Sequence, residues 1–207
     1  EGGHAIHSFL AHQLSLSAFK EYPMEIAEVA SMSMELFSMN HWQPFFEKEA
    51  DLKRAIEHQL ERTITIFPWI AIIDKFQHWV YTHPEHTIEQ RTNEWQNIVK
   101  EFSCKVLNQS GLKEFRAIGW QRQLHLFEVP FYYIEYGIAQ LGAIGMWMQY
   151  QKNPKQALEN YMNALALGGT KTLPELYQTA GLEFNFSPDY VKNLMEFTNQ
   201  ELEKLYH

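Results

Sequence analysis

Hydrophobic residues recur along this chain at intervals of three and four, the spacing that places side chains on one face of an α-helix. Stretches with strict two-residue alternation, which would indicate half-buried strands, are few. The pattern predicts an all-α fold of many helices. The expected helices cover residues 1–14, 23–39, 45–81, 87–107, 112–115, 129–150, 154–167, 173–179 and 188–206, the first of them starting before residue 1.

Prolines and short polar stretches predict where these helices begin, bend and end. Pro23 suits the first turn of a helix, where its missing N–H costs nothing. Pro68 lies inside the pattern of residues 45–81, and we expect it to kink or interrupt that helix, because its ring removes a backbone donor. Thr87 and Gln90 have the spacing of a capping box. The expected breaks are residues 40–44, 82–86 and 108–111, and a helix end with a turn at 168–172.

Composition narrows the class of protein. At 207 residues and 45% hydrophobic content the chain can bury a sizeable core, and one domain is expected. A net charge of −8 without a Lys/Arg stripe argues against a nucleic-acid partner and an anionic membrane surface. No stretch approaches 18 uncharged apolar residues, so we expect no membrane span. The lone Cys104 excludes an intramolecular disulfide and suits a reducing cytoplasm, with a buried thiol.

The first residues carry candidate chemistry. Glu1 and His4 match the last four positions of a His-Glu-x-x-His motif, in which two histidines on one helix face bind one metal ion. The glutamate of such a motif takes a proton from the attacking water. We therefore expect the leading histidine to lie just before residue 1, so that the chain is cut inside its own active site.

A row of carboxylates on the second predicted helix supports a metal site. Glu21, Glu25, Glu28 and Glu35 follow spacings of four, three and seven, which place them near one helix face. Carboxylates on an otherwise apolar helix are costly to bury without a cation opposite. A zinc ion bound by two histidines and one carboxylate, with water in the fourth position, supplies that cation.

Three segments together resemble the M3 family of zinc oligopeptidases, on the side of bacterial oligoendopeptidase F. They are residues 1–8 (Glu-Gly-Gly-His-Ala-Ile-His-Ser), residues 27–31 (Ala-Glu-Val-Ala-Ser) and residues 125–136 (His-Leu-Phe-Glu-Val-Pro-Phe-Tyr-Tyr-Ile-Glu-Tyr). The resemblance implies that residues 1–207 are the C-terminal part of a helical, zincin-like catalytic domain. It also implies that a large N-terminal region of the same protein, which forms the other wall of a deep channel, is missing.

The resemblance assigns roles to residues on the first two helices. His4 and Glu28 would bind one Zn²⁺ together with the absent histidine, and Glu1 would be the general base. Glu25 is an alternative to Glu28 as ligand. Glu35 would orient a ligand histidine through its ring N–H, with a plain surface position as the alternative.

A further group would stabilise negative charge on the substrate carbonyl. It comprises His125, Tyr132, Tyr133 and Tyr136, of which Tyr136 with His125 is preferred. Tyr132 and Tyr136 are four apart and are expected to share a helix face.

The function implied is a zinc-dependent endopeptidase that hydrolyses short oligopeptides, with this chain inactive by itself. The alternative is a non-catalytic helical interaction module, in which the acidic row and the tyrosines are ordinary structure. Residues 153–165 resemble one helix of a tetratricopeptide repeat, but the chain has no second copy to support a solenoid.

Overall fold

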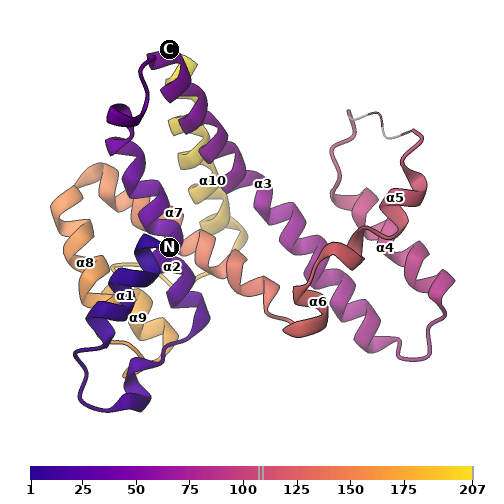
Figure 1. Ribbon diagram of the computed structural model, residues 1–207, viewed down its shortest axis with the longest axis horizontal. Helices are drawn as coiled ribbons and strands as arrows, with labels where there is room; N and C mark the ends of the chain where they lie inside the picture. The colour runs from indigo at the N-terminus through magenta and orange to yellow at the C-terminus, as the bar shows by residue number, and fades with distance from the viewer. Residues whose placement is uncertain (107, 109, 207) are drawn as a thin grey trace. The chain divides into compact units, whose positions relative to one another are not determined.

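The computed structural model describes residues 1–106, 108 and 110–206, and the expected all-α fold is confirmed within them, since they form helices and no strand (Figure 1). The α-helices are α1 (Gly2–Ala11), α2 (Met24–Ser38), α3 (Glu49–Thr82), α4 (Ile88–Phe102), α5 (Lys113–Ala117), α6 (His125–Glu128), α7 (Tyr133–Lys152), α8 (Pro154–Ala166), α9 (Leu173–Thr179) and α10 (Pro188–Glu203). Short 3₁₀ helices are η1 (Ser17–Lys20), η2 (Met39–His41), η3 (Gln43–Phe45), η4 (Gly119–Arg122) and η5 (Lys204–Tyr206). No helix in this part of the chain is long and apolar enough to cross a membrane.

Several helix ends lie where local sequence predicts them. Thr87 and Gln90 form the expected capping box at the start of α4. Gly168 has φ +50° just beyond α8, so the predicted helix end at this glycine is confirmed. The next residue, Gly169, donates its N–H to the carbonyl of Phe19 at 2.8 Å, which fixes the loop against η1.

The long helix expected over this region is present as α3, and Pro68 does not interrupt it. α3 continues through this residue from Glu49 to Thr82. A proline removes one backbone hydrogen bond, and the residues that follow it are held by burial of Ile70, Ile73 and Phe76. Tertiary packing therefore outweighs the local cost.

The predicted helix over residues 129–150 is also wrong at its start. The chain leaves α6 at Val129, which precedes Pro130 and lies outside the helical region (φ −139°, ψ 74°), because the proline ring disfavours that region there. Phe131 then adopts φ 63°, and its N–H donates to Gln77 Oε1 at 3.3 Å. α7 consequently begins only at Tyr133, which leaves Tyr132 outside it.

The expectation of a buried cysteine is wrong as well. α4 ends at Phe102, and Cys104 is exposed in the segment that follows. Leu107, where this helix was expected to end, and Gln109 of the predicted loop lie outside the described residues.

The chain divides into two compact units, one formed by residues 1–64 with 138–207 and the other by residues 65–137. In the first unit, α1, α2, α8 and α9 pack against one another (Figure 1). The hydroxyl of the buried Tyr161 donates to the carbonyl of Ala30 at 2.8 Å, which ties α8 to α2. Burial raises the pKa of Tyr161, so this hydroxyl stays protonated.

The second unit has its own hydrophobic core. Trp95 is buried at its centre, in edge-on contact with Trp69 and Phe76 at centroid distances of 6.1 and 5.0 Å. The indole N–H of Trp95 donates to the carbonyl of Arg116 at 2.7 Å. The segment around α5 is thereby anchored to α4.

Candidate metal centre and histidine–tyrosine cluster

His4 of α1 and Glu28 of α2 lie side by side. The distance from His4 Nε2 to Glu28 Oε2 is 3.7 Å, and the two side chains are 36% and 12% exposed. Two ligands of one tetrahedral zinc ion, each about 2.0–2.2 Å from the metal, stand about 3.4 Å apart. The nitrogen and oxygen donors therefore have a spacing that fits a shared ion.

A glycine makes this proximity possible. A Cβ added to Gly3 would lie 2.1 Å from the carbonyl oxygen of Ala30, far inside van der Waals contact. The backbones of α1 and α2 can approach this closely only because position 3 has no side chain. Since His4 follows Gly3 and Glu28 precedes Ala30 by two residues, the close approach brings the two candidate ligands together.

Ser31 also contacts the Glu28 carboxylate. Its hydroxyl donates to Glu28 Oε2 at 3.0 Å and lies 3.1 Å from the Glu28 carbonyl oxygen. Ser31 is buried, one helical turn beyond Glu28. The oxygen nearest to His4 is therefore the one that Ser31 positions, a contact that reasoning from sequence missed.

His7 occupies the next turn of α1 and is fully buried. Its ring stacks on Tyr22 with centroids 3.4 Å apart and planes 13° from parallel. Burial, with a smaller contribution from His4, lowers the pKa of His7 to about 4. His7 is therefore a neutral packing residue at neutral pH.

The remaining acidic candidates lie at separate positions. Glu1 is exposed at the N-cap of α1, three residues before His4. Burial, with a smaller contribution from the nearby Glu25, raises the pKa of the Tyr177 hydroxyl. The exposed Glu35 accepts a hydrogen bond from Gln59 Nε2 of α3 at 3.1 Å.

Within residues 1–106, 108 and 110–206, no group of three or more His, Cys, Asp or Glu side chains is arranged to hold a metal ion. The pair of His4 and Glu28 is thus a two-ligand arrangement. One imidazole and one carboxylate are donor types that zinc accepts.

A second cluster, in the unit of residues 65–137, joins His125 to three tyrosines. His125 Nε2 lies 3.2 Å from the Tyr136 hydroxyl, and its ring is 5.9 Å from that of Tyr132 and 5.1 Å from that of Tyr133. The turn through Val129 and Phe131 folds α6 back beside the start of α7, so Tyr132 and Tyr136 still make ring contact at 5.3 Å although only Tyr136 is helical. The structure brings all four predicted residues of this group together.

Gln123 sets the protonation of His125. The Gln123 amide nitrogen, which can only donate, lies 2.6 Å from His125 Nδ1. With Nδ1 accepting from this amide, the neutral ring of His125 carries its proton on Nε2, which faces the Tyr136 oxygen at 3.2 Å. Burial raises the pKa of Tyr133 next to this pair. Sequence reasoning missed Gln123, whose nearness to His125 in the chain is a weak signal.

The sequence profile of the family described as peptidase family M3 matches residues 1–196 of this chain. The chain belongs to peptidase family M3. Oligopeptidase PepF of Bacillus subtilis (strain 168) is 23% identical over 212 residues, which cover 99% of this chain and 30% of that protein.

Solved structures agree with the membership of the M3 family. Pz peptidase A with inhibitor 2 has a TM-score of 0.86 and 29% identity, over 97% of this M3 chain and 36% of that chain. A protein assigned as oligoendopeptidase F has a TM-score of 0.88 and 29% identity, over 98% of this chain and 36% of its own. The M3 chain thus spans about a third of the length of the relatives it matches.

Proposed function

We propose that this M3 chain supplies two zinc ligands, His4 and Glu28, and the general base, Glu1, of an endopeptidase that cleaves short oligopeptides. The observation that carries the proposal is the 3.7 Å separation of His4 Nε2 and Glu28 Oε2, next to a glutamate placed three residues before His4. A third protein ligand would come from a histidine before Glu1. We call the longer polypeptide with that histidine the parent protein.

When bound there, zinc would polarise a water molecule and lower its pKa toward neutrality. Glu1 is exposed and not held by a capping hydrogen bond of its side chain, so its carboxylate can accept the proton of the attacking water and pass it to the leaving amine. Ser31 keeps Glu28 Oε2 turned toward His4.

His125, Tyr132, Tyr133 and Tyr136 are proposed to bind the substrate carbonyl as negative charge develops. Because Gln123 fixes the Nε2–H form of His125, the Tyr136 oxygen accepts from the imidazole and its own hydrogen can be donated. A preorganised donor of this kind stabilises a tetrahedral state more than the planar substrate. Tyr136 is the preferred donor of the three tyrosines.

The chain alone is proposed to be inactive, since the structure offers two protein ligands among its described residues and the relatives are about three times longer. A cytoplasmic location fits the single cysteine.

Substitution of Glu1 in the parent protein tests the proposal. Glu1→Gln is expected to leave zinc content unchanged and to lower hydrolysis of a quenched oligopeptide by at least about 10²-fold, because it removes the proton acceptor and spares the ligands. Turnover close to that of the unsubstituted parent would refute the assignment of the base. A residue other than histidine encoded before Glu1 would refute the zinc motif.

A further inference from the structure

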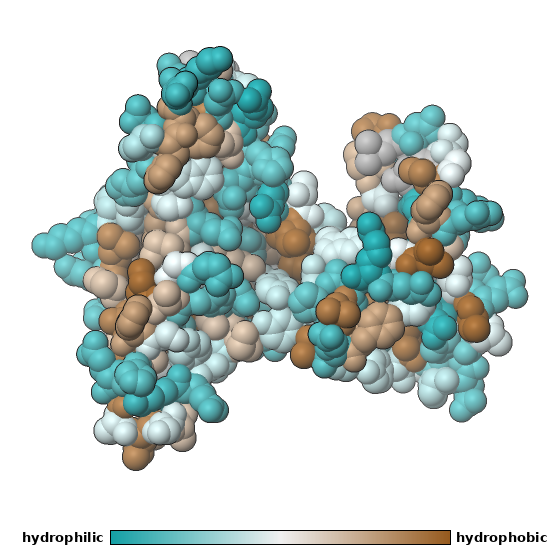
Figure 2. All heavy atoms as spheres, in the orientation of Figure 1, coloured by the Kyte–Doolittle hydropathy of each residue, from teal (hydrophilic) through white to brown (hydrophobic). Residues whose placement is uncertain are grey.

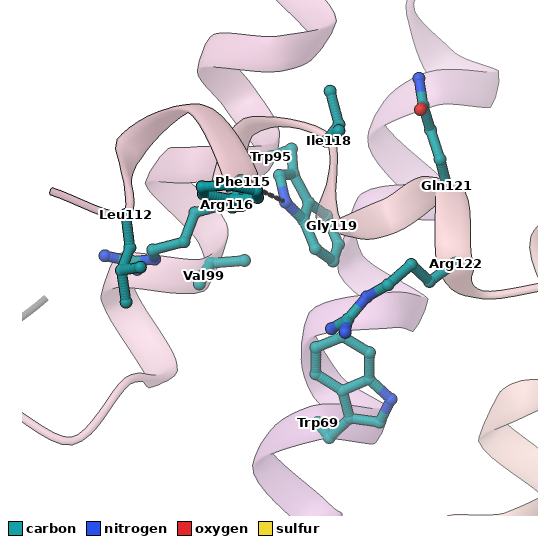
Figure 3. A pocket seen from close by; sticks show the side chains of 10 residues that line it. All are labelled: Trp69, Trp95, Val99, Leu112, Phe115, Arg116, Ile118, Gly119, Gln121 and Arg122. Carbon is teal, nitrogen blue, oxygen red and sulfur yellow. Dashed lines mark hydrogen bonds between the residues drawn. The ribbon is translucent and has the colours of Figure 1, made fainter.

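A cavity of about 430 Å³ lies in the second unit, and its lining includes no residue of the histidine–tyrosine cluster (Figure 3). Its walls come from α3, α4, α5 and η4, and all of its lining residues fall between Trp69 and Arg122. A cavity of this volume accommodates a small molecule or one end of a peptide.

One wall of the cavity is apolar and rigid. Trp95 is held by edge-on contacts with Trp69 and Phe76 and by its hydrogen bond to the Arg116 carbonyl. The rim carries apolar side chains that reach solvent, with Phe115 74% and Ile118 53% exposed. Figure 2 shows hydrophobic residues at the surface of this unit among hydrophilic ones. A bulky apolar group placed here would be removed from water on several sides.

The polar part of the cavity is cationic. Arg116 and Arg122 line it, and the Arg122 side chain extends toward the Trp69 ring (Figure 3). Arg116 also borders an adjoining hollow of about 210 Å³ that is lined by Lys100 and Lys113. Across the described part of the chain, none of these four cations takes part in an ion pair.

This concentration of unpaired positive charge contrasts with the chain as a whole, whose net charge is −8. Glu114 is the acidic residue of α5 itself, and it is exposed. Guanidinium groups bind planar carboxylates through two parallel hydrogen bonds, a geometry that neither an apolar ligand nor a neutral amide can use. The charge therefore selects a ligand with an anionic end.

We propose that this cavity binds the C-terminal residue of a peptide, with its free α-carboxylate on Arg122 and a bulky apolar side chain against Trp69 and Trp95. The inference deepens the proposed peptidase function and rests on it for the class of ligand, because oligopeptides carry one such carboxylate each. It gives the substrate a preferred C-terminal residue, such as phenylalanine or leucine.

Binding of N-acetyl-L-phenylalanine to the metal-free 207-residue chain tests the proposal, with calorimetry and tryptophan fluorescence as readouts. The acid is expected to bind at least about tenfold more tightly than N-acetyl-L-phenylalanine amide, and more tightly than acetate, since it alone has both features. Arg122→Gln is expected to weaken binding of the acid about tenfold and to leave the amide unchanged.

Two further variants make the test specific. Arg122→Lys keeps the charge without the planar fork, and an intermediate affinity is expected. Arg54→Gln is the matched control, because Arg54 is an exposed arginine of α3 that pairs with Asp51 outside this cavity, and it should bind the acid like the unsubstituted chain. Circular dichroism of each variant establishes that the helices are retained.

Equal affinity for the acid and the amide, or an unchanged affinity in Arg122→Gln, would overturn the proposal. Tighter binding of adenosine monophosphate than of the acid would overturn it in favour of a phosphate ligand. The readout requires neither zinc nor Glu1, so its failure is distinct from failure of peptide hydrolysis in the parent protein. Selective binding of the acid together with an inactive parent would instead refute the peptidase function.

Discussion

Gly3 of α1 lies directly against the carbonyl oxygen of Ala30 in α2, where a Cβ would come within 2.1 Å of that oxygen. His4 follows Gly3, and Glu28 and Ser31 lie within two residues of Ala30; these three residues form the candidate metal centre. Helix packing and ligand placement therefore depend on the same close approach. A change at Gly3 should affect both stability and metal binding.

Gly3→Ala is expected to destabilise the chain by about 1–3 kcal/mol, because the added methyl group meets rigid backbone that must move apart. Urea unfolding measures this loss, and zinc affinity of the parent protein should fall with it. Gly2→Ala is the control, since a Cβ there comes no closer than 3.8 Å to Met34 Cγ. It should be neutral or slightly stabilising because alanine favours helix. Equal stability of the two variants would contradict the role of Gly3.

Ser31→Ala in the parent protein is expected to lower zinc affinity about 10–100-fold, since it removes the hydrogen bond that orients Glu28 Oε2. Competition with a zinc-binding dye measures this affinity. Ser33→Ala is a matched control on the same helix, because Ser33 is buried and its hydroxyl lacks a hydrogen-bond partner within the described residues. A loss of affinity of the same size in both variants would indicate a general effect on α2 instead of a contact with the ligand.

The stability of the chain should depend on pH through His7. Its pKa is lowered from 6.5 to about 4 by burial and by His4, so the folded state favours the neutral imidazole. The contribution is fully present above pH 6.5 and is lost as the pH falls toward 4, with a slope of at most about 1.4 kcal/mol per pH unit.

His7→Phe keeps a ring that can stack on Tyr22 and removes the titrating group. The free energy of unfolding, measured by urea at intervals between pH 4 and 7, should therefore fall less steeply with acidity in the variant. Identical slopes in both proteins would show that His7 does not titrate across this range.

Tyr136→Phe in the parent protein is expected to lower kcat about 10²–10³-fold with little change in KM, because it removes a donor needed only as the oxyanion forms. Gln123→Leu should lower kcat by a smaller factor, since His125 then loses the amide that fixes its tautomer. Tyr81→Phe is the control, because Tyr81 lies in the same unit with its ring 5.1 Å from that of Phe131, outside the cluster. A kcat for Tyr136→Phe like that of Tyr81→Phe would contradict the assigned role.

Local signals in the sequence predict much of the fold. Thr87 with Gln90 and the glycine at 168 act within one helical turn, so their consequences can be foreseen without the rest of the structure. The left-handed Phe131 could not be foreseen, because the Gln77 side chain that accepts its N–H is 54 positions away. Pro68 stays helical for a similar reason, since distant contacts hold the residues after it.

For the candidate metal centre, the sequence identifies the candidate ligands but not the contacts that bring them together. The spacing of Glu1 and His4 indicates metal chemistry only together with the segments farther along the chain, and the choice of Glu28 over Glu25 comes from the family resemblance. Glu28 lies beside His4 because α2 packs closely against Gly3 of α1. Hydrophobic periodicity cannot reveal such a contact between two helices. Ser31 and Gln123 went unnoticed because serine and glutamine have many ordinary roles, and only the measured distances single them out.

The zinc content of the parent protein after exhaustive dialysis tests whether His4 and Glu28 share one zinc ion. The unsubstituted parent and its Glu25→Gln variant should each retain about one zinc ion per chain, whereas Glu28→Gln should lose most of it, because a structural or catalytic site needs its carboxylate ligand. A Glu28→Gln variant that keeps zinc as tightly as the unsubstituted parent would show that Glu28 is not a ligand of the ion.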